Sequence, residues 1–138
     1  MKRLTHTLYA KRAEGYLDTV LSVMLLCFVL VFILSAVSLL LQVSRLQSAA
    51  DRLCEYACEA GHTDLADYEE TVRRDTGLDF TADYSGSAHL DTSTGRVQLG
   101  DAVRVTLTAE VRVFGFGNHI GIFRISASAQ GLGRVYWK

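Results

Sequence analysis

Charge, proline and glycine are all missing from one long stretch of this chain of 138 residues. The sequence has no proline at all, and residues 19–44 contain no Asp, Glu, Lys, Arg or Gly. Sixteen of the residues in 20–41 are Leu, Val, Ile or Phe. As a helix, residues 20–41 extend about 33 Å, enough to cross a hydrocarbon core about 30 Å thick. We therefore expect a transmembrane helix; a buried core helix, the alternative, needs a larger protein around it.

The sequence also lacks the usual patterns of catalysis and metal binding. Its four histidines, His6, His62, His89 and His119, have no second ligand at helical or zinc-finger spacing. No glycine-rich loop joins a strand to a helix, and no serine occupies a nucleophile elbow. The sequence predicts a non-enzymatic protein without a cofactor, a metal site or a small-molecule substrate.

Charge is distributed unevenly along the chain. Residues 1–14 carry a net charge of +3, whereas residues 45–138 carry −3. Basic residues beside a first span hold that end in the cytoplasm. We expect a single-pass protein of the cell membrane, with a cytoplasmic N-terminus and an extracytoplasmic C-terminal domain. Topology explains the basic end better than a nucleic-acid-binding arm does, so we expect no nucleic acid partner.

A cleaved secretory signal is the rival interpretation of the N-terminal region. The apolar core of a signal peptide has about 7–15 residues, and the run found in this chain is much longer. Small residues that suit a cleavage site occur near residues 47–50. The helical pattern continues through them, however, and we expect a retained anchor.

Apolar residues recur at alternating spacings of 3 and 4 beyond the membrane segment, which predicts that the helix continues from about residue 15 to residue 60. Gly61 then suits a left-handed C-cap. These apolar residues form a seam along one face of the helix. The seam packs either against a neighbouring helix or against the sheet of the same chain, and different parts of it can do each. The seam consists of Val43, Leu46, Ala50, Leu53, Ala57 and Ala60.

Two cysteines, Cys54 and Cys58, lie four residues apart on one face of this helix. Such a pair has Cβ atoms about 5–6 Å apart, whereas a disulfide requires about 3.8 Å. Two alternatives remain open: small buried thiols, or an interchain or strained bridge. Cys27, within the apolar run, is interpreted as a small apolar residue.

A second helix is predicted over residues 64–76, with Thr63 or Asp64 as its cap and Gly77 at its end. The period then changes to two, with strands expected near residues 80–84, 88–90, 96–99, 103–114 and 122–130. The residues expected to face inward are Val103, Val105, Leu107, Ala109, Val111, Val113, Phe123, Ile125, Ala127 and Ala129.

These patterns predict an α+β fold, in which a long transmembrane and amphipathic helix and a short second helix precede an antiparallel sheet of about 4–5 strands. We divide the chain into a basic tail or leader (residues 1–14), the long helix (15–60) and an extracytoplasmic α+β domain (61–138).

This plan resembles that of pilins and pseudopilins: a short basic leader, Gly15, a carboxylate at Asp18, a long apolar helix with an amphipathic extension, and a small antiparallel sheet. More narrowly, it resembles the TadE-like minor pilins of tight-adherence pilus systems. It is also similar to an uncharacterised Gram-positive family of short single-span proteins, in the sequence of residues 14–20 and in the ending at residues 129–138.

The resemblance implies cleavage by a prepilin peptidase between Gly15 and Tyr16. The typical pattern has Glu at the fifth position after the cut; here that position is Val20, and the acidic residue, Asp18, is third. In the pilin role, Asp18 pairs with the N-terminal amine of a neighbouring subunit; alternatively, it is an interfacial carboxylate facing headgroups.

The resemblance implies a pilin-like subunit of a pilus or secretion assembly, whose partners are the membrane, other pilin-like subunits and assembly proteins. The alternative is a single-pass, membrane-anchored extracellular domain that binds or senses an external partner. A membrane-bound enzyme is the third reading, disfavoured because no catalytic constellation is found.

Overall fold

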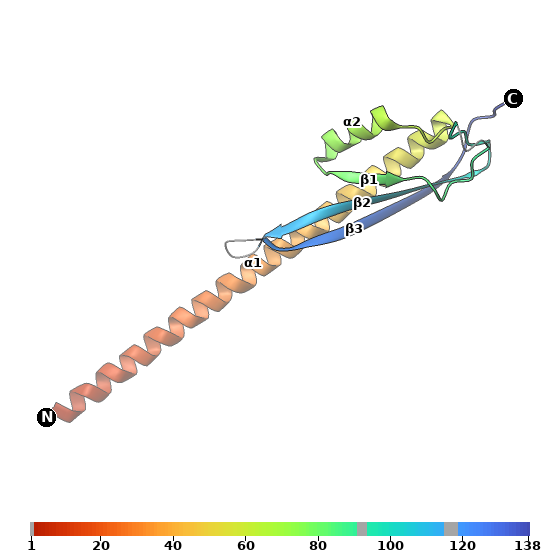
Figure 1. The fold of residues 1–138 in the computed structure, drawn as a ribbon. Helices are drawn as coiled ribbons and strands as arrows, with labels where there is room; N and C mark the ends of the chain where they lie inside the picture. The colour runs from red at the N-terminus through yellow and green to blue at the C-terminus, as the bar shows by residue number, and fades with distance from the viewer. Residues whose placement is uncertain (1, 91–93, 115–118) are drawn as a thin grey trace. The chain divides into compact units, whose positions relative to one another are not determined.

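The computed structural model describes the backbone of residues 2–90, 94–114 and 119–138, and the side chains of residues 16–90, 94–112 and 122–138. The chain forms two compact units, which divide between Val37 and Ser38. The first unit is helical, and the second contains the end of the same helix together with a second helix and a sheet (Figure 1).

Helix α1 comprises Lys2–Ala60, 59 residues. It is longer than expected, because residues 1–14 were predicted to be a tail or leader and the structure has helix from Lys2 onward. Those residues include no proline or glycine, and extending an existing helix costs far less than nucleating one. Gly61 ends the helix as predicted, with φ 71° and an N–H that donates to the Ala57 carbonyl at 2.9 Å.

Helix α2 comprises Ala66–Thr76 and ends at Gly77, which has φ 66°, as the sequence predicts. The predicted caps are wrong, because Leu65 occupies the N-cap and makes no side-chain capping bond. Thr63 has other partners: its Oγ1 lies 3.1 Å from His89 Nε2 and donates to the Gly95 carbonyl at 3.3 Å.

The sheet has the order β1-β2-β3, formed by Phe80–Asp83, Ala102–Phe114 and His119–Leu132. Both pairings are antiparallel, which confirms the α+β class. The sheet has three strands within the described residues, so the prediction of 4–5 was too high.

Residues 88–90 and 96–99 do not form the strands predicted there. Their backbone bonds are isolated ones, such as Ala88 N–H to Ala102 O and the single bridge between His62 and Arg96. At residues 96–99, turns at Gly95 and Gly100, both with positive φ, leave too little extended chain between them for a ladder.

Strands β2 and β3 are longer than predicted. The connection between them was expected at residues 115–121; residues 119–121 belong to β3, and residues 115–118 lie outside the described backbone. The core lies between the inner face of the sheet, the second half of α1, and α2. The inward positions of β2 from Val103 to Val111 are buried as predicted, while Val113 lies outside the described side chains.

On β3, Ala127 is buried, and Ile125 and Ala129 are partly buried and pack against the core. Phe123 pairs with the buried Val111, which places it on the inward face as predicted, but its side chain is 49% exposed. Burial decreases toward this end of the strand because β3 is an edge strand, and alternation of apolar residues does not indicate how far along an edge strand the core extends.

Candidate functional site

One helical segment of the described chain, Tyr16–Ala60, is long and apolar enough to cross a membrane. None of its most apolar window is buried within the protein, and residues 16–30 are all exposed. Soluble monomers rarely expose a continuous apolar surface of this kind, because the hydrophobic effect disfavours it. The segment is therefore consistent with a single-pass membrane anchor.

The predicted leader cleavage point and the predicted assembly carboxylate lie on α1. The helix continues through Gly15 and Tyr16, and the Tyr16 side chain is 77% exposed. Asp18 is also exposed, half a turn further along. Because the two residues are two positions apart on one helix, their side chains point to opposite sides of it, and both are accessible.

The predicted association seam is mostly buried inside the second unit. Leu46, Ala50, Leu53 and Ala57 have no exposed surface and belong to the core that α1 forms with the sheet. Val43 is 38% exposed. Of the two alternatives left open by the sequence, packing against the chain's own sheet therefore accounts for these four residues. Val43, which is exposed, and Ala60, which is partly exposed, are the residues of the set that remain accessible.

The thiols of Cys54 and Cys58 are free and buried, and both face Gly131 on β3. A Cβ atom at Gly131 would lie 2.7 Å from Cys58 Sγ and 3.3 Å from Cys54 Sγ, so glycine permits the close approach of the helix to the strand. The Cys54 thiol also lies 3.9 Å from the Val103 carbonyl oxygen. This arrangement matches the buried-thiol alternative.

Beside the thiols, an open groove of about 640 Å³ runs between α1 and the C-terminal part of the chain. Its helical wall includes Asp51 and Glu55, and its opposite wall includes Leu132 and Arg134. Charges of both signs line a mainly apolar floor.

Burial raises the pKa of the Cys54 thiol from its ordinary value of 9.0 to about 11, and the neighbouring Cys58 contributes in the same direction. Because the folded state holds this proton more tightly than the unfolded state, the stabilisation is complete below pH 9 and is lost between pH 9 and about 11.

We expect Cys54→Ala to weaken the alkaline decline of the urea midpoint between pH 8 and 10.5. An identical decline in both proteins would contradict the assignment.

The C-terminal residues bind the end of α1 through a set of contacts that sequence reasoning missed. We call these contacts, made by Gly61, Arg96, Gln98 and Trp137, the clasp. The Trp137 indole N–H donates to the Gly61 carbonyl at 3.1 Å, and the Arg96 guanidinium stacks over the same ring at 4.7 Å. Gln98 accepts from the Trp137 backbone N–H at 2.9 Å and donates to its carbonyl at 3.2 Å. The Arg134 N–H donates to the Cys58 carbonyl. The only sequence signal was a lone tryptophan near the end of the chain.

Gly61→Ala is expected to destabilise the second unit by about 2–4 kcal/mol. Alanine at this position would have to adopt a positive φ, and its Cβ would lie 2.7 Å from Val135 Cβ and 3.0 Å from the Trp137 ring nitrogen. Gly77→Ala is the matched control, because its φ is similar but nothing lies within 4 Å; it should cost about 1 kcal/mol. Urea unfolding of both variants measures the difference, and equal midpoints would show that the clasp contributes nothing.

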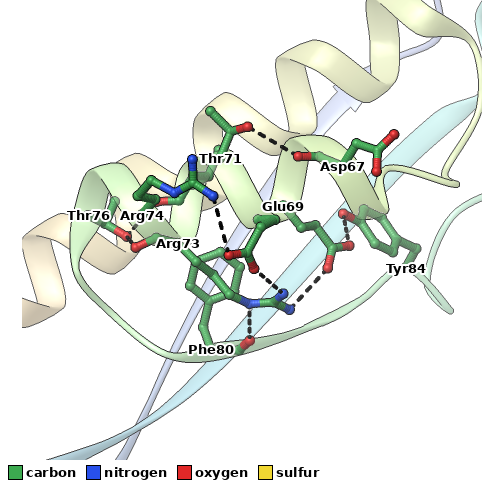
Figure 2. A network of polar contacts seen from close by, with 10 residues as sticks. Asp67, Glu69, Thr71, Arg73, Arg74, Thr76, Phe80 and Tyr84 are labelled. Carbon is green, nitrogen blue, oxygen red and sulfur yellow. Dashed lines mark hydrogen bonds and ion pairs between the residues drawn. The ribbon is translucent and has the colours of Figure 1, made fainter.

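Helix α2 is fastened to the sheet by a polar network (Figure 2). The Arg73 guanidinium donates to Glu69 at 3.2 Å and to the Phe80 carbonyl at 3.1 Å, and it stacks over the Phe80 ring. Glu69 also accepts from the Tyr84 hydroxyl at 2.8 Å. Burial, together with this acidic partner, raises the pKa of Tyr84. Arg73 and Glu69 are thus paired with each other, and both connect α2 to the segment of β1 and Tyr84.

Among the described side chains, no group of three or more His, Cys, Asp or Glu residues could hold a metal ion. In comparisons with known proteins, a family model described as "Domain of unknown function (DUF4320)" matches residues 23–138. No curated protein and no solved structure matches the chain.

Proposed function

The chain belongs to the DUF4320 family, and from that premise we propose that it is a non-enzymatic, pilin-like (TadE-like) membrane subunit of a tight-adherence pilus or a related secretion assembly. The observation that carries the proposal is the difference in burial between the two parts of α1. Residues 19–44 carry no charged side chain and are mostly exposed, whereas Leu46, Leu53 and their neighbours form the core of an α+β unit.

The proposed orientation places residues 1–14 in the cytoplasm and the second unit outside the cell. The net charge of +3 in residues 1–14, beside the apolar run, supports it. In this orientation the bond between Gly15 and Tyr16 lies at the cytoplasmic face, where a prepilin peptidase can reach it. Tyr16 then becomes the N-terminal residue of the mature subunit.

Asp18 is proposed to set the register of assembly by pairing with the N-terminal amine of a neighbouring subunit. The carboxylate is exposed on α1 and lies within three residues of the proposed new terminus. An ion pair removed from water at the edge of the apolar run is costly to break, which makes it effective in holding subunits in one arrangement.

Asp18→Asn is expected to lower about tenfold the share of the protein recovered in cross-linked, high-mass assemblies, a change of about 1.4 kcal/mol. Asp18→Glu, which keeps the charge, is the control and should retain most of the assembly. The measurement is made in cells that carry the tight-adherence machinery, with membrane insertion followed in parallel. Wild-type assembly by Asp18→Asn would remove the pilin role of this carboxylate.

The groove beside Gly131 favours a second candidate function, a membrane-anchored domain that binds an external protein segment. This candidate predicts that a photoreactive residue in place of Leu132, which is 61% exposed at the groove, captures a ligand in cells without other pilin-like subunits. Failure to form any such product would favour the pilin-like subunit.

A further inference from the structure

The end of the β2–β3 hairpin exposes large apolar side chains on both faces of the sheet. Ile122 is 63% exposed and Phe123 is 49% exposed. Because successive strand residues point to opposite faces, these two side chains form an apolar end rather than part of one packed face. The sequence from residue 113 to residue 123 contains no Asp, Glu, Lys or Arg, and an arginine, Arg112 or Arg124, flanks it on each side.

Two contacts define how β3 lies along α1 within the second unit. The Arg134 N–H donates to the Cys58 carbonyl at 2.9 Å, and the Gln47 side-chain amide donates to the Ser128 carbonyl at 3.2 Å. Residue numbers therefore increase in the same direction along the helix and along the strand. The hairpin end, which precedes Ser128 on β3, therefore lies in the same direction from these contacts as the apolar run, which precedes Gln47 on α1.

The distances show how far the hairpin reaches. From Ser128 back to Phe123 the strand covers about 16 Å, at about 3.3 Å per residue. From Gln47 back to Leu41 the helix covers about 9 Å, at 1.5 Å per residue. Phe123 therefore reaches the level of Leu41 even where the strand is inclined to the helix. Leu41 is the end of the predicted span, residues 20–41, and its side chain is 56% exposed.

From this geometry we propose that the hairpin end, at Ile122 and Phe123, rests at the boundary between the headgroups and the acyl chains of the membrane that α1 spans. The inference depends on the anchor that is part of the proposed function. A bilayer fits better than a protein partner because the apolar end of the hairpin is level with the apolar surface of α1 at Leu40 and Leu41, which are 68% and 56% exposed.

The charges around the hairpin end suit this position. Arg124 donates to Glu110 across the strands at 3.2 Å, and register places Arg112 directly opposite Ile122. Arginine side chains just outside an apolar segment extend toward lipid phosphates while their stems contact apolar surface. The outer unit thereby gains a second contact with the membrane, which restrains its rotation about the anchor.

Tryptophan quenching by brominated lipids tests the proposal in the full chain. Phe123→Trp is reconstituted in phosphatidylcholine vesicles whose lipids carry bromine near the carbonyl groups or deep in the acyl chains. Leu99→Trp is the matched control, because Leu99 is 56% exposed at the other end of the hairpin, beside Gly100. Leu30→Trp reports on the span, and the signal of the native Trp137 is subtracted using the wild-type chain.

We expect shallow bromines to quench Phe123→Trp about threefold more strongly than Leu99→Trp, and deep bromines to quench it less than they quench Leu30→Trp. Equal quenching at positions 123 and 99, with Leu30→Trp quenched, would overturn the hairpin contact and leave the anchor intact. A blue-shifted emission at position 123 without quenching would also overturn the proposal, because it would show that protein rather than lipid shields this tryptophan from water. An unquenched Leu30→Trp would overturn the anchor and the inference together. Ile122→Trp repeats the test at the neighbouring exposed position.

Discussion

Replacing both Leu26 and Leu30 with arginine is expected to remove most of the protein from the carbonate-resistant membrane fraction. Each arginine near the centre of a span costs about 2.5–3.5 kcal/mol on an insertion scale, and each lost leucine removes about 0.3–0.6 kcal/mol. The double change therefore opposes insertion by about 6–8 kcal/mol. The sixteen Leu, Val, Ile and Phe residues of the span favour insertion by about 5–10 kcal/mol in total, so little or no driving force remains.

The control for this experiment places the same two charges outside the span at the same spacing. Ser44→Arg with Ser48→Arg keeps the four-residue interval on exposed positions of α1, where both side chains lie beyond the apolar run. This variant should stay in the membrane pellet like the wild type. Retention of the Leu26 and Leu30 variant in the pellet would show that the apolar helix is not what holds the protein there.

Leu53→Ala is expected to destabilise the second unit by about 2–5 kcal/mol. Leu53 is fully buried between α1 and the sheet, and truncating a buried leucine removes apolar contacts and leaves a cavity. Domains of this size are stable by about 5–15 kcal/mol, so the loss is a large fraction of the total. Urea unfolding of the detergent-solubilised chain, followed by the fluorescence of Trp137, measures the change.

Val43→Ala is the matched control on the same seam, because Val43 is 38% exposed and should lose less than about 1 kcal/mol. The comparison also separates the two interpretations of the seam. If Leu53→Ala left the urea midpoint unchanged but broke up assemblies, Leu53 would belong to an interface between chains, and the structural assignment of the seam would be wrong.

The features predicted correctly from the sequence are those with a long period or a strict local requirement. The apolar run is too long for a strand, and the alternation from Val103 to Val111 permits only one buried face. Gly61 and Gly77 end their helices because both positions have a positive φ, which glycine adopts without strain.

The features that could not be predicted depend on contacts between distant residues. A heptad seam has the same pattern whether its partner is another chain or, as here for Leu53 and Ala57, the sheet of the same chain. The clasp joins Gln98 to Trp137, residues 39 positions apart, and no periodicity in either segment indicates it. Residues 96–99 lie between turns at Gly95 and Gly100, which limit them to isolated backbone bonds, and residues 88–90 also make only isolated bonds.

The candidate site follows the same division. The span could be placed from charge and hydropathy alone, because the bilayer selects for these properties directly. Tyr16 and Asp18 were singled out by the resemblance to pilins, and their roles stay predictions. The groove beside Gly131 could not, because it depends on how closely α1 approaches β3 at the two thiols.

The intact mass of the protein isolated from its native membrane, with and without the prepilin peptidase, tests the central claim most directly. The account predicts the loss of residues 1–15 only when the peptidase is present, so that Tyr16 becomes the N-terminal residue of a membrane-anchored subunit. An uncut chain in both strains would contradict the pilin-like precursor. A cut near Ala50 would contradict the anchor as well, because it would release the outer unit from its membrane helix.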